Sequence, residues 1–338
     1  MLAELGVLAA LEKHGARLKR LDGRLHGGKR KVLDVRYDAL GPDAHGLAVH
    51  RAALFDQLLN TAHADGATLE YGKEGSGVET SGNGAAIQFG GKDRSPTFDL
   101  IVDALGVRSP LVKRVNSHLP FGALWANAPF PAGHGFDESV LSQRYRSADV
   151  SSGVMPIGSI DEGGERLAAF FWTLRADAYP AWRDAPLDHW KAEVLALWPE
   201  AATVLAHFTS HDQFVFAQYA HHTAKFPVEG RVVHIGDAWH AASPQLGQGA
   251  NMALLDALAL ANALNETDDI DAALSAFVKA RRGHVRLYQT ISWLFTPVYQ
   301  SNLKVIPALR DVFAQPLSVT WPMPKLLASI VAGTLGSR

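Results

Sequence analysis

A buried-type strand, a glycine-rich loop and a long apolar helix together constrain the fold of this chain more than any other feature. The run RVVHIGD (231–237) is apolar and typical of a strand inside a parallel sheet. It continues through the small residues of AWHAASPQLGQGAN into MALLDALALANAL, whose apolar positions favour a helix. Strand–loop–helix units of this kind build α/β folds, and such folds bind ligands at the carboxyl ends of their strands.

The loop between this strand and this helix suits an anion or an electron-rich ring. Backbone N–H groups at a helix start lack partners within the helix and carry partial positive charge. Gly247 and Gly249 let a flat ligand approach that backbone closely. Asp237 ends the strand, where a carboxylate suits the hydroxyls of a sugar-like chain. A plain structural connection stays open at this point, because glycine-rich loops often only join a strand to a helix.

The rest of the chain alternates between short strands and helices. HRAALFDQLLNTAHADG predicts a helix that ends at Gly66, and TFDLIVDAL predicts a second strand buried on both faces. We expect short strands at ATLEYG, GVETSG and AAIQFGG, a hairpin around Gly27–Gly28, and a helix over 1–14. Aromatic residues and prolines increase between about 116 and 225, as in a separate sheet, and the chain from about 270 is helical.

Composition narrows the classes of function. The chain has 338 residues, a length typical of two domains. Its net charge of −2 argues against a nucleic-acid partner, and the absence of cysteine excludes a thiolate metal site. The histidines show no metal-binding spacing, and we expect no metal. With no basic leader and no apolar run of the roughly 20 residues that span a bilayer, a cytoplasmic location is expected. The basic segment 279–286, followed by Trp293 and Leu294, leaves peripheral membrane contact open, although a solvated helix face is the simpler interpretation.

The stretch GDAWHAASPQLGQGANMALLDA resembles the signature G-D-x-x-H-x-x-x-P-x-x-G-x-G-x-N-x-x-x-x-D-A of FAD-dependent aromatic hydroxylases, the para-hydroxybenzoate-hydroxylase-like and UbiH-like flavoprotein monooxygenases. The resemblance implies that Asp237 bonds the ribityl chain of FAD and that backbone N–H groups of the loop face the flavin ring. The chemistry of such enzymes belongs to the flavin, so no catalytic side chain is assigned. The cofactor-binding residues that the resemblance implies in this stretch are Gly236, Asp237, Pro244, Gly247, Gln248, Gly249, Ala250 and Asn251.

Two further segments resemble the same family. HRAALFDQLL is similar to its R-x-x-L-x-x-x-L helix, which implies that Arg51 approaches the FAD pyrophosphate. DLIVDALG is similar to D-L-V-V-G-A-D-G, but Leu105 stands where the family has an acidic residue associated with nicotinamide-cofactor use. The resemblance therefore implies a monooxygenase that hydroxylates an apolar aromatic or polyprenyl-type small molecule with FAD, O2 and NAD(P)H. Two alternatives stay open: a non-hydroxylating flavin oxidoreductase (dehydrogenase, reductase or halogenase-like), and an inactive, flavin-deficient fragment or binding module.

One part of the family pattern is not found in the sequence. The family opens with a strand, G-x-G-x-x-G, a helix and a second strand that ends in an acid, and these glycines admit the pyrophosphate. GRLHGGKR (23–30) only approaches a nucleotide-hydrolase phosphate loop, because Arg30 stands where Ser or Thr must meet magnesium. Without the G-x-G-x-x-G unit we expect weak FAD binding, an open sheet edge and exposed apolar faces.

These observations predict an α/β protein with three parts. The first is an N-terminally incomplete, Rossmann-like FAD-binding domain in two segments, 1–115 and 226–268. The second is an inserted substrate domain with a mixed β-sheet at 116–225, and the third is a helical C-terminal tail at 269–338.

Overall fold

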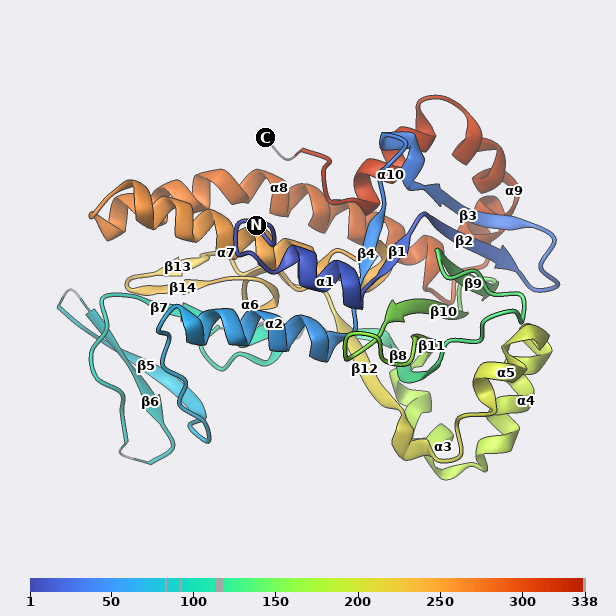
Figure 1. The fold of residues 1–338 in the computed structure, drawn as a ribbon, viewed down its shortest axis with the longest axis horizontal. Coiled ribbons are helices and arrows are strands. Elements are labelled where there is room, and N and C mark those ends of the chain that lie inside the picture. Colours follow the sequence, from blue (N-terminus) through green and yellow to red (C-terminus); the bar gives the residue numbers. More distant parts are fainter. Residues whose placement is uncertain (83, 92, 113–117, 337–338) are drawn as a thin grey trace.

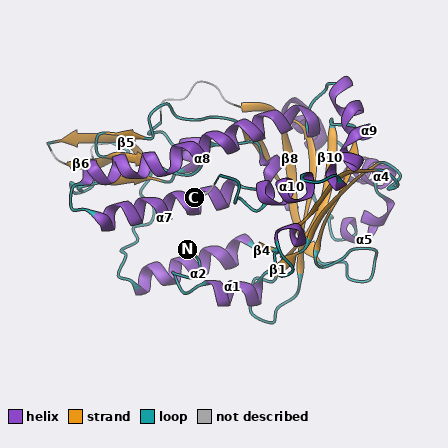
Figure 2. Cartoon of the chain, turned by 90° about the horizontal axis from the view of Figure 1, so that it is seen from above, coloured by secondary structure: helices purple, strands orange, loops and turns teal. Residues whose placement is uncertain are grey.

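The computed structural model of the chain describes residues 1–82, 84–91, 93–112 and 118–336 (Figure 1). Two long helices, α7 (Gly249–Glu266) and α8 (Ile270–Tyr299), lie side by side. Figure 2 shows strands β8 (His118–Pro129) and β10 (Val150–Gly158) standing across one end of these helices, with α1 (Leu8–His14) and α2 (Arg51–Ala64) on the side opposite α8. The predicted α/β arrangement, with a mixed sheet and C-terminal helices, is confirmed.

The two strands predicted to be buried form a small parallel sheet. β7 (Ile101–Asp103) pairs in parallel with β14 (Val232–His234), and β13 (Val228–Glu229) adds an antiparallel strand on the other side of β14. Within the described residues β7 therefore lies at a sheet edge, as expected. The prediction that β7 is buried on both faces is wrong, because the Val102 side chain between its two buried neighbours is 44% exposed.

A larger sheet of seven strands has the order β12-β8-β11-β10-β9-β2-β3. All neighbours are antiparallel except β2 and β9, which run parallel. The predicted hairpin at Gly27–Gly28 is confirmed as β2–β3, so this sheet takes strands from two distant chain segments. The domain boundary expected between residues 115 and 116 lies outside the described residues. The strands are β2 (Arg20–Leu25), β3 (Lys31–Arg36), β8 (His118–Pro129), β9 (Val140–Arg146), β10 (Val150–Gly158), β11 (Leu167–Arg175) and β12 (Val215–Ala220).

Aromatic residues fill the core on one face of this sheet. Phe170 and Trp172 alternate along β11 and meet Trp190 of α4 edge-on. Trp198, directly after α4, is also buried in this core. The period-two pattern of β11 thus buries one face under a helical layer. The covering helices are α3 (Tyr179–Asp184), α4 (Leu187–Leu197) and α5 (Ala202–Leu205).

Most of the predicted short elements are present. α2 begins after His50, whose side chain accepts a hydrogen bond from the Ala52 N–H, and it ends before Gly66 as predicted. The helix expected over 1–14 begins only at Leu8, and ATLEYG is an exposed loop rather than a strand, because none of its side chains finds a buried face. The remaining elements are β1 (Ala16–Leu18), β4 (Gly46–Ala48), β5 (Gly75–Ser81), β6 (Gly84–Phe89), α9 (Val305–Val319) and α10 (Met323–Val331). Among the described helices, none is long and apolar enough to cross a membrane.

Candidate functional site

The loop after β14 is shaped by two glycines with positive φ. Gly236 has a φ of +56°, and a Cβ there would lie 2.9 Å from the Cβ of Ala253 in α7. The short helix α6 (Asp237–His240) follows, and Gly247 then takes the left-handed conformation, with a φ of +65°, just before α7. Other residues are strained at such positions, so both glycines are needed to aim the loop at the start of α7.

A buried carboxylate under this loop holds it in place. Both Asp256 and His240 are buried, and the Asp256 Oδ2 accepts hydrogen bonds from the Gly236 N–H at 2.9 Å and from His240 Nε2 at 2.6 Å. Its Oδ1 accepts from Arg281 Nε at 2.8 Å. Burial alone would raise the pKa of the Asp256 carboxyl, but the hydrogen bond and electrostatic attraction of His240 and the hydrogen bonds from Arg281 and the Gly236 N–H bring it below its usual range.

The sequence reasoning did not assign His240 or Asp256 to the site. Both are fixed positions of the motif quoted above, at its second and last specified polar positions. The signal was therefore present, but only the fold shows that the two side chains bond each other across 16 residues of sequence. The two side chains are buried under the loop, so they position its backbone and do not contact a ligand.

Five of the nine predicted cofactor residues line one cavity of about 630 Å3. Gly249 begins α7 and is exposed beside them, and α7 has no side-chain cap over its first N–H groups. Asp237 is exposed at the start of α6, whereas Arg51 begins α2 and does not line the cavity. The five lining residues are Pro244, Gly247, Gln248, Ala250 and Asn251.

The seven-stranded sheet forms the opposite wall of this cavity. The aromatic part of the wall is formed by Trp125 and Phe171, whose ring centroids are 5.0 Å apart, together with Tyr145 and Tyr219. Aliphatic side chains of β2 and β3 and polar side chains of β9–β11 complete it. The described lining contains no Asp, Glu, Lys or Arg. The wall is therefore mostly apolar with a few polar groups and contains no acidic side chain, lysine or arginine, as is common for sites that hold small molecules.

The C-terminal helix α10 closes the cavity beside the loop. Gln248 Nε2 donates to the Val331 carbonyl at 2.5 Å, and the Gln248 Oε1 accepts from Asn251 Nδ2 at 2.8 Å. The Tyr288 hydroxyl of α8 donates to the Ile330 carbonyl at 3.1 Å. These bonds tie the end of α10 to α7 and α8, so the start of α7 opens toward the cavity under a fixed cover.

A second buried network stands at the ends of β7 and β14. Asp103 accepts from Ser109 Oγ at 2.6 Å and from the Leu105 N–H at 3.0 Å, and its Oδ2 lies 2.7 Å from His234 Nδ1. Burial would raise the pKa of the Asp103 carboxyl, but the hydrogen bonds from His234 and Ser109 lower it. The carboxylate of Asp103 thus holds this turn. It lies two residues before Leu105, the position at which the family resemblance places an acid, and the Leu105 side chain is exposed.

The residues of the loop fit the flavin end of FAD. An uncapped start of an 18-residue helix offers N–H donors to an electron-rich ring, and Gly247 and Gly249 leave its backbone open to a flat ligand. The exposed carboxylate of Asp237 suits hydroxyl groups. Among the described residues, no group of three or more histidine or acidic side chains is arranged to hold a metal.

The fold and this site together define a flavin-binding class of protein. The family model described as "FAD binding domain" matches residues 1–282, and the chain belongs to this family of FAD-dependent monooxygenases. The FAD-dependent aromatic hydroxylase resemblance inferred from the sequence is therefore confirmed, and with it an oxidoreductase that uses FAD.

Two curated relatives match over most of the chain. The protein named as a FAD-dependent monooxygenase, YetM, of Bacillus subtilis is 26% identical over 328 residues, which cover 93% of this chain and 84% of YetM. Salicylate hydroxylase of Pseudomonas putida is 27% identical over 332 residues, which cover 86% of this chain and 72% of that enzyme.

Solved structures share the fold. Klebsiella pneumoniae HpxO, in complex with FAD and uric acid, is 18% identical with a TM-score of 0.80 and covers 99% of this chain and 85% of HpxO. Pseudomonas aeruginosa PqsL, in complex with 2-aminobenzoylacetate, is 16% identical with a TM-score of 0.74 and covers 93% of this chain and 84% of PqsL. At these identities the likeness shows a shared fold.

Proposed function

We propose that this protein hydroxylates a neutral, apolar aromatic small molecule, with FAD as cofactor, O2 as oxidant and NAD(P)H as reductant. The observation that carries the proposal is the cavity of about 630 Å3 between the start of α7 and the aromatic wall of the seven-stranded sheet. We place the reaction in the cytoplasm, where NAD(P)H is available, and peripheral contact with a membrane surface belongs to the same proposal.

The charge of the substrate is argued from the lining. Salicylate and 2-aminobenzoylacetate, which appear in the names of relatives, each carry a carboxylate. A carboxylate in this cavity would find no Lys or Arg among the described lining residues. Burying an unpaired charge is costly, so the cavity favours substrates without one.

Polar groups in the wall orient the substrate. The Gln143 Oε1 is buried and has no hydrogen-bond partner among the described residues, so a substrate hydroxyl would satisfy it. Burial raises the pKa of Tyr37 to about 12, and it raises the pKa of Tyr219 as well. Both phenols therefore stay neutral at physiological pH and add no charge to the cavity.

The roles of the cofactor residues follow from their positions. When bound, FAD supplies the two-electron redox chemistry and the activation of O2. In this proposal the start of α7, from Gly247 to Asn251, donates backbone hydrogen bonds to the flavin ring. Asp237 accepts from the ribityl hydroxyls, and Arg51 neutralises the pyrophosphate. The cover formed by α10 excludes water from the reacting atoms.

A test compares paired substrates. The protein, supplied with FAD and NAD(P)H, is given neutral aromatic compounds and their carboxylated analogues under 18O2, and the products are analysed by mass spectrometry. We expect 18O in a hydroxylated product from the neutral members only. Gln143→Leu should raise KM, whereas Gln218→Leu, at an exposed glutamine of β12, should not. Hydroxylation of only the carboxylated members would overturn the proposed substrate class.

The same experiment separates the second candidate, a flavin oxidoreductase that does not hydroxylate. Leu105 motivates this candidate, because an exposed leucine replaces the acid associated with nicotinamide-cofactor use. NAD(P)H oxidation without any labelled product would support it. If the protein neither binds flavin nor oxidises NAD(P)H, that result would support the third candidate, an inactive, flavin-deficient fragment or binding module.

A further inference from the structure

Helix α9 is amphipathic in the reverse of the usual sense. Most of its surface toward the solvent is apolar and none of its exposed side chains is charged, whereas a buried arginine faces the protein. The exposed side chains recur at helical spacing, so they form one continuous stripe. They are Val305, Ile306, Leu309, Val312, Phe313, Leu317 and Val319.

The inward face fixes this orientation. Arg310 is buried, and its guanidinium donates to the Ser147 carbonyl at 2.7 Å and to the Val298 carbonyl at 3.0 Å. It also lies 5.3 Å from the ring centroids of both Tyr145 and Tyr299. Rotating α9 to hide its stripe would break the bonds of Arg310 to the two carbonyls and remove it from the two tyrosine rings, so that only its ion pair with Asp311 on the same helix would remain. The apolar stripe is therefore held outward by the fold.

The stripe continues past the end of α9. Trp321, in the short connection to α10, is 86% exposed, which makes it the most exposed large apolar side chain described. Lys304 precedes α9 and Lys325 lies in the first turns of α10, and both are exposed. An uncharged stripe with a tryptophan at one end and lysines at its borders is the pattern of a helix that lies in a membrane interface.

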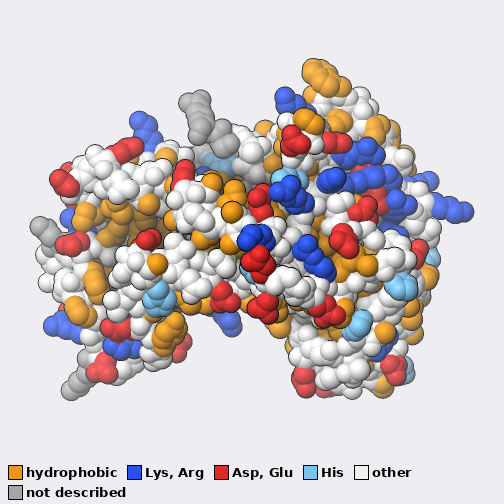
Figure 3. All heavy atoms as spheres, in the orientation of Figure 1, with side chains coloured by type: hydrophobic (Ala, Val, Ile, Leu, Met, Phe, Trp, Pro, Cys, Tyr) orange, Lys and Arg blue, Asp and Glu red, His pale blue; other side chains and the backbone are white. Residues whose placement is uncertain are grey.

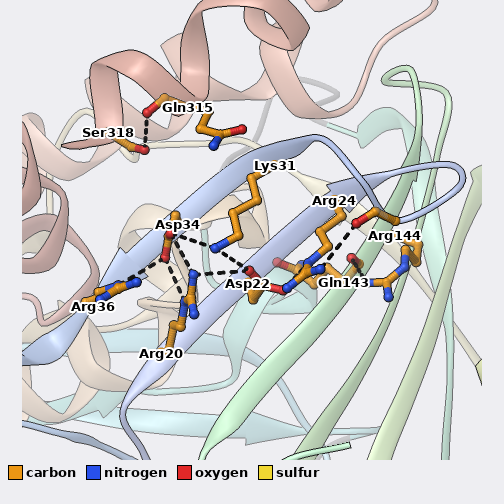
Figure 4. Close-up of polar contacts among 11 residues, drawn as sticks. Arg20, Asp22, Arg24, Lys31, Asp34, Arg36, Gln143, Arg144, Gln315 and Ser318 are labelled. Atoms are coloured by element: carbon orange, nitrogen blue, oxygen red, sulfur yellow. Dashed lines mark hydrogen bonds and ion pairs between the residues drawn. The ribbon is translucent and has the colours of Figure 1, made fainter. Parts of the chain in front are cut away.

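The hairpin under α9 adds positive charge. α9 packs on β3, and Figure 4 shows Gln315 and Ser318 of α9 above Lys31 and Asp34 of that strand. Cations within the hairpin are paired, for example Arg20 with Asp34 at 2.7 Å. Two further cations, Lys29 and Arg30, are exposed in the hairpin turn. In Figure 3 blue side chains gather on the side of the molecule below the orange side chains that project at this corner.

We propose that this surface, the stripe of α9 with Trp321 and the bordering cations, docks on a lipid bilayer that contains anionic lipid. Apolar side chains would enter the interface while Lys29, Arg30, Lys304 and Lys325 meet lipid phosphates. A second copy of the chain is a poorer occupant. A two-fold contact places the same patch on both partners, so it would bring these cations together.

The position of α10 connects this surface with the cavity. α10 follows Trp321 directly, and its Leu327, Ile330 and Val331 line the cavity. A neutral aromatic compound partitions into a bilayer, so docking here would bring the enzyme to its substrate. This last link rests on the proposed function, and the docking specifies the peripheral membrane contact that the proposed function includes.

Vesicle sedimentation tests the docking. The full chain is mixed with vesicles of phosphatidylcholine alone or of phosphatidylcholine with phosphatidylglycerol. We expect binding to the mixed vesicles that weakens as salt is added. Phe313→Ser and Trp321→Ser should each lower the partition coefficient about tenfold, since each removes one large apolar side chain from the interface. Phe226→Ser is the matched control, because Phe226 is 55% exposed and Phe313 is 52% exposed.

Further measurements decide whether a bilayer or a second copy of the chain covers this surface. Lys29→Glu with Arg30→Glu should weaken binding to the mixed vesicles and leave the urea unfolding midpoint unchanged. The proposal is overturned if the mixed vesicles bind no protein, or if Phe226→Ser weakens binding as much as Phe313→Ser. It is equally overturned if sedimentation velocity shows a dimer that Phe313→Ser dissociates, since the stripe would then join two copies. Hydroxylation of a water-soluble neutral substrate without vesicles is measured separately, so loss of docking and loss of the proposed activity are distinguishable.

Discussion

Replacing the buried Asp256 by asparagine tests whether this carboxylate holds the loop before α7. Asp256 accepts three hydrogen bonds, from the Gly236 N–H, His240 and Arg281. An asparagine keeps one acceptor oxygen, and its amide group must face a donor. It also leaves the Arg281 guanidinium buried without its counter-charge. Breaking a buried ion pair from one side costs about 3–5 kcal/mol, and we expect Asp256→Asn to lower the free energy of unfolding by that amount.

The assay is urea unfolding of the full chain, followed by circular dichroism and by tryptophan fluorescence. Trp239 lies in α6 between Gly236 and His240, so the fluorescence change includes the loop itself. Asp177→Asn is the control, because Asp177 is exposed and pairs with Arg175 on the surface, where such pairs contribute little. The reasoning is refuted if Asp256→Asn unfolds at the same urea concentration as the wild type.

The pH dependence of the stability difference between wild type and Asp256→Asn has an expected direction. The folded-state pKa of Asp256 is lowered, so its contribution to stability is present above the ordinary aspartate pKa of about 3.9. That contribution is lost as the pH falls through the lower, folded-state value. The stability difference between wild type and Asp256→Asn should therefore be constant near neutral pH and shrink in acid. A difference that grows in acid would contradict the assignment.

Two further changes test the cavity and the cofactor site. In Gly153→Ala the new Cβ would lie 2.2 Å from the Phe171 ring, so the ring must move into the cavity and we expect a higher KM for the substrate. The control is Gly283→Ala, whose new Cβ on α8 meets no other atom and should leave KM unchanged. The sequence of 338 residues contains no G-x-G-x-x-G cradle for the pyrophosphate. Each charge-assisted hydrogen bond that such a cradle would add contributes about 1.5–3 kcal/mol to binding. Titration calorimetry should therefore show FAD binding in the micromolar range or weaker. Nanomolar binding would show that the flavin-end contacts suffice.

The pattern of the sequence predicted the elements whose fold is decided locally. The strand at 231–237 and the helix after Gly249 follow from apolar runs and from glycines at positive φ. The hairpin at Gly27–Gly28 follows from turn chemistry. Its place in the seven-stranded sheet could not be predicted, because it depends on parallel pairing of β2 with β9, more than a hundred residues away.

The site was predicted unevenly for the same reason. Gly247 to Asn251 lie in one short segment, so their meeting at the start of α7 needs only local geometry. The aromatic wall opposite comes from strands that are distant in sequence, and alternate aromatics also suit any sheet core. Within the basic segment 279–286, Arg281 and His284 are buried partners in the Asp256 network, so charge counting alone misjudges that face.

Two independent observations converge on α10. The described lining of the cavity contains no Asp, Glu, Lys or Arg, which favours an apolar substrate, and the stripe on α9 is held outward by Arg310, which favours an apolar environment. α10 joins them, since it follows Trp321 and lines the cavity. An uncharged cavity behind a charged or polar outer surface would instead suggest a substrate taken from water. If docking and substrate preference are linked in this way, Trp321→Ser should raise KM for a lipid-dissolved substrate but not for a water-soluble one. Equal KM changes for both substrates would show that the cavity and the stripe act independently.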